Sequence, residues 1–246
     1  MLVSFSGGVD SSLLAVLAKE VLGPNTRCAL LDSEVVPRKA IDEAKMIAED
    51  FGLLLDIIPL HIMGDDRFTK NPAERCYWCK KNSSAVLKWR EEELGFACIA
   101  DGINVSDTGE HRPGLVASTE EGIVHPFLEA GITKADIREI AQDLGYHFWD
   151  KPSAACLSSR IPYGDEITHK KLTMVEEAEA YLHAHGFTQS RVRMHGSTAR
   201  IEVVKDDIPN VITLQDELVK SFKAIGFSYV TLDLEGYRSG SMDEVL

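Results

Sequence analysis

The chain of 246 residues has no surplus of positive charge. It contains 26 Lys and Arg residues against 39 Asp and Glu residues, which gives a formal net charge of -13 at pH 7. A protein that binds nucleic acid usually presents a basic surface, because Lys and Arg neutralise the phosphate backbone. The composition therefore argues against an RNA or DNA partner.

The sequence also lacks long hydrophobic runs, repeats and low-complexity segments. No run approaches the roughly 20 apolar residues of a transmembrane helix. The short apolar stretch before Gly7 has no basic lead and no cleavage signature of a secretory signal. We therefore expect a cytoplasmic protein with no membrane partner.

Cysteine is scarce, with five residues, which we expect to be thiols or metal ligands rather than disulfides. Cys28 and Cys98 stand in apolar stretches that predict buried strands, so we assign both to the core. Cys76 and Cys79 form a Cys-x-x-Cys pair before a predicted helix, and Cys156 follows a run of small residues. The pair suits a shared metal, an iron–sulfur cluster, a redox pair or two inert thiols, and its spacing does not choose among them.

The segment from Ser6 to Ser12 lies between a predicted strand at 2–5 and a predicted helix at 12–22. Its glycines let the backbone approach an anion, and the N–H groups of a helix start favour phosphate. The lysine of a Walker-type loop is missing, because the first lysine is Lys19. We therefore predict a phosphate cradle of another kind, with a plain Gly-Gly turn capped by Asp10 or Ser11 as the structural alternative.

Strands and helices alternate over the first two-thirds of the chain. We expect strands at 26–31, 53–58 and around Cys98, and helices at 37–51, 80–94 and 133–144. This alternation predicts an α/β fold in which helices flank both faces of a parallel sheet. Asp32, Ser33, Asp101 and the glycine turn would then lie beyond the carboxyl ends of the strands, where such folds bind ligands.

The pattern changes after Pro162. We expect a helix at 168–184, a hairpin of strands at 191–194 and 199–204, a helix at 209–225 and a strand at 228–234. These elements predict a small α+β domain with antiparallel pairing. We place the boundary near residue 160, which gives domains 1–160 and 161–246.

Arg191, Arg193 and His195 alternate along a predicted strand and so share one face. In an acidic protein this cluster predicts an anion site, although a solvated sheet face is an equal alternative. Arg160 lies close to Cys156 in a loop, where its guanidinium could hold a phosphate or a carboxylate.

Four stretches together resemble the LarE family of ATP-dependent sulfur transferases, which belongs to the N-type ATP pyrophosphatases with a PP-loop. They are Ser6 to Ser11, Asp101 to Gly114, Pro152 to Gly164 and Arg191 to Glu202. The resemblance implies the PP-loop fold, ATP and Mg²⁺. It also implies adenylation of a carboxylate of pyridinium-3,5-biscarboxylic acid mononucleotide, which sulfur then converts to a thiocarboxylate during synthesis of the nickel-pincer nucleotide cofactor.

The resemblance also implies roles for individual residues. Cys156 matches the sulfur site of the family, and Asp10 helps to hold Mg²⁺. We expect the nucleotide at Ser6, Gly7, Gly8, Val9, Asp10, Ser11, Asp32 and Ser33. We expect the nucleotide substrate at Ser159, Arg160, Arg191 and Arg193, with the arginines toward its phosphate. The family further implies a homo-oligomer and a sulfide or other sulfur donor as a partner.

The sulfur source differs within this family. Some members give up the sulfur of their own cysteine, and others carry three cysteines around a [4Fe–4S] cluster that can bind an extra sulfide. Cys76, Cys79 and Cys156 match the second pattern, in which three thiolates leave one iron without a protein ligand. We therefore favour the cluster.

Two other classes of enzyme remain as alternatives. A tRNA-thiolating pyrophosphatase would also use these cysteines, but the net charge and the lack of an evident RNA-binding module oppose it. An amidating ligase or a nucleotide-binding regulator would bind the nucleotide in the same loop, and its cysteines would be incidental.

Overall fold

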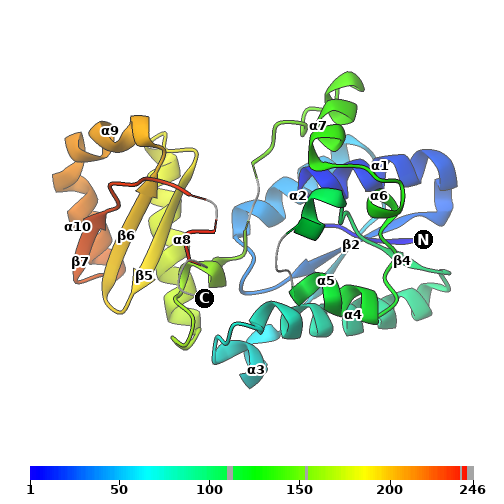
Figure 1. The fold of residues 1–246 in the computed structure, drawn as a ribbon, viewed down its shortest axis with the longest axis horizontal. Coiled ribbons are helices and arrows are strands. Elements are labelled where there is room, and N and C mark those ends of the chain that lie inside the picture. The colour runs from blue at the N-terminus through cyan, green and yellow to red at the C-terminus, as the bar shows by residue number, and fades with distance from the viewer. Residues whose placement is uncertain (110–112, 153–154, 239, 243–246) are drawn as a thin grey trace. The chain divides into compact units, whose positions relative to one another are not determined.

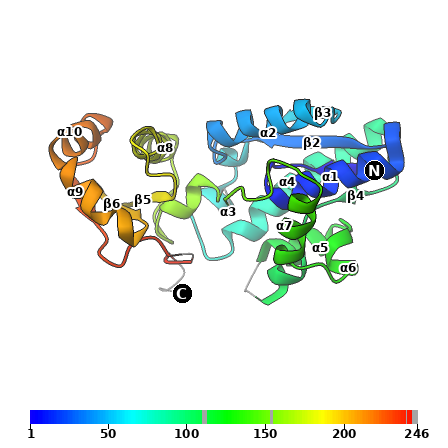
Figure 2. The ribbon, with the colours of Figure 1, turned by 90° about the horizontal axis from the view of Figure 1, so that it is seen from above.

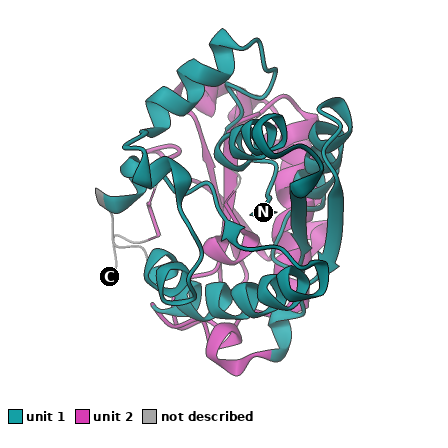
Figure 3. Ribbon diagram, turned by 90° about the vertical axis from the view of Figure 1, so that its right-hand side faces the viewer, with its two compact units in different colours: residues 1–64, 74–154 teal, residues 65–73, 155–246 magenta. Residues whose placement is uncertain are grey.

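The computed structural model describes residues 1–109, 113–152, 155–238 and 240–242. The chain divides into two compact units (Figure 3), of which unit 1 comprises residues 1–64 and 74–154 and unit 2 comprises residues 65–73 and 155–246. The division between the units falls at residues 154 and 155. The segment 65–73 lies between the two parts of unit 1 in the sequence but belongs to unit 2. The domain boundary near residue 160 stays a prediction.

Unit 1 is built on a four-stranded sheet in which all pairs of strands are parallel (Figure 1). The strands are β1 (Leu2–Ser4), β2 (Arg27–Asp32), β3 (Leu55–Pro59) and β4 (Ile99–Ala100), and their order is β3-β2-β1-β4. The parallel sheet confirms the predicted α/β class. β1 is an inner strand, and the glycine turn at residues 6–8 follows its carboxyl end, which is the edge where such folds bind ligands.

Helices cover both faces of this sheet (Figure 1). They are α1 (Val9–Leu22), α2 (Arg38–Asp50), α4 (Arg75–Leu94), α5 (Pro113–Glu120), α6 (Pro126–Glu129) and α7 (Lys134–Asp143). Val3 packs with buried residues of α1, α2 and α7, whereas its neighbour Leu2 packs on the other face with Leu87 of α4. This division follows from the alternation of side chains along a strand.

Two predictions about the cysteine segments need correction. The helix expected at 80–94 begins at Arg75, because residues 75–80 contain no Gly or Pro that would end a helix. Cys76 and Cys79 therefore lie inside α4 rather than before it. Cys28 is buried in β2 as predicted, but Cys98 is only half-buried, because β4 is short and begins one residue later.

Unit 2 contains a three-stranded sheet covered by helices (Figure 2). Its elements are α3 (Asp66–Thr69), α8 (His169–Ala184), β5 (Ser190–His195), β6 (Thr198–Val203), α9 (Ile208–Thr213), α10 (Gln215–Ile225) and β7 (Tyr229–Leu232). A 3₁₀ turn at Leu157–Arg160 precedes α8. The β5–β6 hairpin is antiparallel as predicted.

The last strand of unit 2 differs from the prediction. β7 pairs with β6 in the parallel sense, because α9 and α10 form the crossover that a parallel connection requires. The single helix expected at 209–225 is two helices that meet at Leu214. Among the described residues of both units, none of the helices has the length and apolar character needed to cross a bilayer.

Candidate active site

The glycine turn between β1 and α1 is tightly constrained. Gly7 has a positive φ of 69°, and a Cβ atom there would lie 2.6 Å from the Cβ of Ala44 in α2. Only glycine satisfies both conditions. The side chain of Val9 is buried in the core, so this residue offers a ligand only its backbone.

The start of α1 is not capped by a side chain. Gly8 is the N-cap residue, and no side-chain hydrogen bond caps the helix there. The hydroxyl of Ser11 instead donates to the carbonyl oxygen of Gly8 at 3.2 Å and accepts the N–H of Ser6 at 3.2 Å. The first-turn N–H groups thus face the turn without a side-chain cap, which is the arrangement that binds phosphate at helix starts.

Asp10, in the first turn of α1, forms an ion pair with the ammonium of Lys134 in α7. It also lies 3.4 Å from the donating Nδ2 atom of Asn104. The Asp101-Gly102 segment packs against the turn, since a Cβ on Gly102 would lie 2.8 Å from the backbone nitrogen of Ser11. One carboxylate together with phosphate oxygens is a common donor set for Mg²⁺, so Asp10 fits that role.

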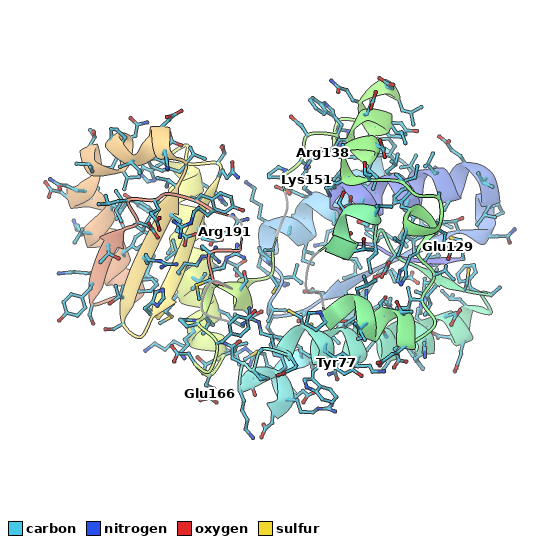
Figure 4. All side chains as sticks on the ribbon, in the orientation of Figure 1. Tyr77, Glu129, Arg138, Lys151, Glu166 and Arg191 are labelled. Atoms are coloured by element: carbon cyan, nitrogen blue, oxygen red, sulfur yellow. The ribbon has the colours of Figure 1, made fainter. Side chains whose placement is uncertain are left out.

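A second lysine supports the glycine turn. Lys151 donates to the carbonyl oxygen of Gly7 at 2.9 Å and pairs with Glu43 at 2.9 Å. Arg138 fixes the backbone of this region by donating to the carbonyl oxygens of Trp149 and Lys151, and Figure 4 shows the side chains of Arg138 and Lys151 near each other. Lys134 and Lys151 were not predicted as parts of this site, because each lies far from residues 6–12 in sequence.

Asp32 and Ser33 lie at the carboxyl end of β2, as predicted for a ligand site. Arg38 holds both residues, donating to the Asp32 carboxylate at 2.5 Å and to the Ser33 carbonyl oxygen at 2.6 Å. The Asp32 side chain is 37% exposed, so it remains accessible to a ligand.

Asp101 joins β4 to α4 and α5. Its carboxylate accepts hydrogen bonds from Lys80 at 2.9 Å and Ser118 at 3.0 Å, and it lies 2.7 Å from Nδ1 of His125. Burial alone would raise the pKa of Asp101, but the bond with His125 and the charge of Lys80 outweigh burial and lower the pKa to about 2. Asp101 is therefore ionised, and its carboxylate links β4 to α4 and α5 beside the glycine turn.

Cys76 is exposed and Cys79 is half-buried on α4. Neighbouring residues of α4 bind the end of α5, because Tyr77 donates to Glu120 at 2.7 Å and Lys81 donates to Glu121 at 2.5 Å. Cys156, the third predicted ligand, belongs to unit 2. Within the described ranges of the chain, no three His, Cys, Asp or Glu side chains gather as a metal site.

Cys156 lies at the start of the 3₁₀ turn of unit 2 and is partly exposed. Its sulfur lies 2.9 Å from the hydroxyl oxygen of the buried Ser158. Its carbonyl oxygen accepts hydrogen bonds from Ser159 and Arg160, both at 2.9 Å. The thiol is therefore presented on a backbone that two neighbouring side chains, Ser159 and Arg160, hold through the Cys156 carbonyl oxygen.

Arg160 is 2% exposed, and all three of its side-chain nitrogens donate to protein acceptors. Nε and Nη2 bind the Glu179 carboxylate of α8 at 2.8 Å, and Glu179 also accepts the N–H of Val192 in β5. These contacts favour a structural role for Arg160, which clamps the Cys156 turn to α8. Its predicted contact with a substrate phosphate stays a prediction.

The arginines of β5 differ from each other in their surroundings. Arg193 is buried against Glu202 at 3.1 Å and donates to the carbonyl oxygen of Ser159 at 3.0 Å, so the alternative of a solvated sheet face does not hold at this position, and its contact with a substrate phosphate stays a prediction. Arg191 is half-buried, and its guanidinium lies 5.4 Å from the ring centre of Tyr237. Burial and then the nearby charge of Arg160 lower the pKa of Arg191, so an anion would be favourable there.

The amino-acid sequence is similar to known proteins over nearly the whole chain. Residues 1–82 match the family model of NAD synthase. The chain is 37% identical over 245 residues to pyridinium-3,5-bisthiocarboxylic acid mononucleotide synthase of Lactiplantibacillus plantarum, covering 99% of this chain and 89% of the relative. It is 41% identical over 249 residues to an uncharacterized protein of Synechocystis sp., covering 100% and 92% of the two chains. An uncharacterized protein of Methanocaldococcus jannaschii is 34% identical over 239 residues, covering 97% and 91%.

Proposed function

The chain belongs to the LarE family of PP-loop sulfur transferases, and from this premise we propose that it uses ATP to convert a carboxylate of pyridinium-3,5-biscarboxylic acid mononucleotide into a thiocarboxylate. The full-length similarity to a pyridinium-3,5-bisthiocarboxylic acid mononucleotide synthase is the observation that carries this proposal. The uncapped helix start at Gly8 and the constrained Gly7 support it independently, because both belong to a phosphate-binding turn.

The first step is an adenylation. A carboxylate oxygen of the substrate attacks the α-phosphorus of ATP, the bond to the bridging oxygen breaks, and pyrophosphate leaves. The turn at residues 6–11 binds the leaving pyrophosphate through backbone N–H groups and thereby stabilises the charge that develops on it. Asp10 holds Mg²⁺, which neutralises phosphate charge when bound. Asp32 and Ser33 bind the nucleoside part of ATP at the end of β2.

The second step forms the carbon–sulfur bond. A sulfur nucleophile attacks the acyl carbon of the mixed anhydride, and AMP leaves with the electron pair of the broken carbon–oxygen bond. Cys156 is the sulfur site, and its turn is held in place by Ser159 and Arg160. Preorganisation of this kind favours sulfur transfer, because the segment that carries the sulfur site does not have to be ordered during the reaction.

Arg191 is the strongest candidate for binding the phosphate of the substrate. Unlike Arg160 and Arg193, it is only half-buried, and the charges of these two arginines add to burial in lowering its pKa. A phosphate would offset the repulsion among these guanidinium groups. Ser159 is a second candidate, because it lies between the Cys156 turn and Arg193.

The match of Cys76, Cys79 and Cys156 to the three-cysteine members of the family favours a [4Fe–4S] cluster as the sulfur source, which these three cysteines would hold. Cys76 and Cys79 are three residues apart on α4, so one helix offers two thiolate ligands. Such a cluster would supply the transferable sulfide.

Analysis of the products tests the reaction. We expect turnover with ATP, Mg²⁺, sulfide and the pyridinium dicarboxylate nucleotide to release AMP and pyrophosphate in equal amounts. Asp10→Ala should abolish turnover and leave the circular dichroism spectrum unchanged, because Asp10 is a partly exposed ligand rather than a core residue. The matched control is Asp42→Ala, which removes an exposed carboxylate from α2 of the same unit. Release of ADP and phosphate, or an amide product with ammonia, would contradict the proposal.

A further inference from the structure

An aromatic side chain lies beside the half-buried arginine of unit 2. The guanidinium of Arg191 in β5 lies over the ring of Tyr237, 5.4 Å from the ring centre. At this distance a guanidinium is attracted by the negative face of an aromatic ring. Tyr237 comes after β7, and Figure 1 shows this C-terminal part of the chain, drawn in red, running from β7 back across the sheet. The contact therefore joins two parts of unit 2 that are far apart in the sequence.

The chain around Tyr237 is fixed on this sheet. The N–H of Tyr237 donates to the carbonyl oxygen of Val203, the last residue of β6, at 2.8 Å. Farther along the chain, the buried hydroxyl of Ser241 accepts a hydrogen bond from Arg193 at 3.2 Å and donates to Glu202 at 2.9 Å. The Tyr237 ring thus extends from an ordered backbone, as a preorganised binding surface requires.

The sulfur site lies in the same neighbourhood. Burial acts to lower the pKa of the Arg160 guanidinium, but its hydrogen bonds and ion pair with Glu179 outweigh burial and raise the pKa. The Cys156 and Tyr237 side chains add to this rise, so both lie within electrostatic reach of the same guanidinium. The carbonyl oxygen of Cys156 also accepts a hydrogen bond from Arg160 at 2.9 Å. A ligand on the Tyr237 ring would therefore lie near the sulfur site.

Two other tyrosines of unit 2 are less suited to bind a cationic ligand. Tyr181 stacks on His185 with the ring centres 4.1 Å apart, so that face is already covered. Tyr229 lies on the edge strand β7 and is 66% exposed, and a cation gains least from a ring that is surrounded by water. Tyr237 is half-buried, and the guanidinium on its ring shows that a flat cation fits there.

The substrate of the proposed reaction has two groups that match this pair of side chains. Its pyridinium ring is flat and positively charged, as a guanidinium is, and its phosphate is joined to that ring through a ribose. A phosphate that binds Arg191 draws the guanidinium away from the aromatic ring, because a charge-assisted hydrogen bond is stronger than a cation–π contact. The face of the Tyr237 ring then becomes free for the pyridinium.

We propose that Tyr237 binds the pyridinium ring of the substrate through a cation–π contact, in the place that the Arg191 guanidinium holds in this structure. This inference rests on the proposed function, because it takes the pyridinium nucleotide as the substrate. Tyr237 is then a specificity-determining residue, which favours a charged pyridinium over an uncharged ring of similar shape. It also keeps the ring close to Cys156 during sulfur transfer.

Titration calorimetry of the full-length protein with three ligands tests this role. The ligands are pyridinium-3,5-biscarboxylic acid mononucleotide, the same nucleotide reduced to its uncharged dihydropyridine, and ribose 5-phosphate. In Tyr237→Leu we expect the ratio of the affinities for the charged and the reduced nucleotide to fall by about threefold to thirtyfold, because the cation–π contact is lost. Affinity for ribose 5-phosphate should stay within about twofold of the wild type, because that ligand has no pyridinium ring.

The control variants keep an aromatic ring at position 237. Tyr237→Phe should retain the wild-type ratio, and so should the matched control Tyr229→Leu, which removes an exposed tyrosine of the same unit. Replacement of Tyr237 by trifluorophenylalanine keeps the ring but weakens the negative charge of its face. That substitution should lower the ratio relative to Tyr237→Phe, and it provides the test if Tyr237→Leu does not fold.

The outcomes separate this inference from the proposed function. An unchanged ratio in both Tyr237→Leu and the trifluorophenylalanine variant would overturn the role of Tyr237 and leave the proposed function standing. Equal losses for all three ligands would also overturn it, because they indicate a structural role. A wild-type protein that binds no pyridinium nucleotide and releases no AMP in its presence would contradict the proposed function itself, and this inference with it.

Discussion

Single residues with the same side chain have different roles in this protein, and burial separates them. Arg160 and Arg193 are buried and bind carboxylates of their own unit, whereas Arg191 is half-buried among like charges. The cysteines divide in a similar way. Burial raises the pKa of the Cys28 thiol to about 12, which keeps it protonated and unsuited to bind iron, while Cys76 is exposed.

Substitution of single cysteines tests the sulfur source. We expect Cys76→Ala and Cys79→Ala to lose iron and multiple-turnover activity, because each removes one of three proposed thiolate ligands. Iron and acid-labile sulfide are measured after anaerobic purification. Cys98→Ala is the matched control, since Cys98 is half-buried in unit 1 outside the trio, and it should keep its iron. Active iron-free protein that stops after one turnover and loses the mass of one H₂S at Cys156 would contradict the cluster and leave the sulfur transferase standing.

At the scale of elements, the Asp101 carboxylate holds β4, α4 and α5 together through His125, Lys80 and Ser118. This arrangement connects the helix that carries Cys76 and Cys79 to the segment that packs on the phosphate-binding turn. A change at Asp101 should therefore affect the stability of the unit and not only one contact.

The acid stability of the protein tests this role of Asp101. The pKa of Asp101 is about 2 in the folded protein, below its ordinary value of 3.8. The ionised carboxylate thus contributes about 2 kcal/mol above pH 4, which is lost as the pH falls from 4 toward 2. We expect Asp101→Asn to be less stable at pH 7 and to lose less of its free energy of unfolding between pH 4 and pH 2. Urea denaturation at each pH measures both effects, with Asp42→Asn as the exposed control. Identical pH dependence in wild type and Asp101→Asn would refute this assignment.

At the scale of the whole molecule, the chain contributes to unit 2 before it has completed unit 1. Asn71 fixes this connection, because its buried side-chain amide donates to the carbonyl oxygens of Ile161, Pro162 and Asp165 at 3.2, 2.7 and 3.0 Å. The carbonyl oxygen of Asn71 also accepts the N–H of Gly164 at 2.9 Å. The short segment 65–73 is thus a structural part of unit 2.

We expect Asn71→Ala to lower the free energy of unfolding by about 2–4 kcal/mol, because it removes the donor for several carbonyl oxygens and places alanine at a φ of 56°. Asn71→Gly should recover only the share due to backbone strain, since glycine accepts this φ but has no amide. Urea denaturation followed by circular dichroism measures both variants. Stabilities within about 0.5 kcal/mol of wild type for both would show that the amide is not needed.

Features that depend on neighbours in the sequence could be predicted from the sequence alone. These include the parallel α/β class, the glycine turn before α1, the capping box of α7 and the β5–β6 hairpin. Each is encoded in a local pattern, such as apolar periodicity or a cap residue at fixed spacing. The four motif stretches that indicate the family are also local, because each is a short run of neighbouring residues.

The tertiary structure alone decided which distant groups meet. It placed Lys134 beside Asp10, clamped the Cys156 turn through Arg160 and Glu179, and buried Arg193 against Glu202. It also made β7 parallel to β6 and assigned the segment 65–73 to unit 2. No local pattern encodes these results, because a charged side chain has the same sequence signature whether it meets water, a ligand or a buried partner. Packing of elements far apart in the chain determines which of the three it meets.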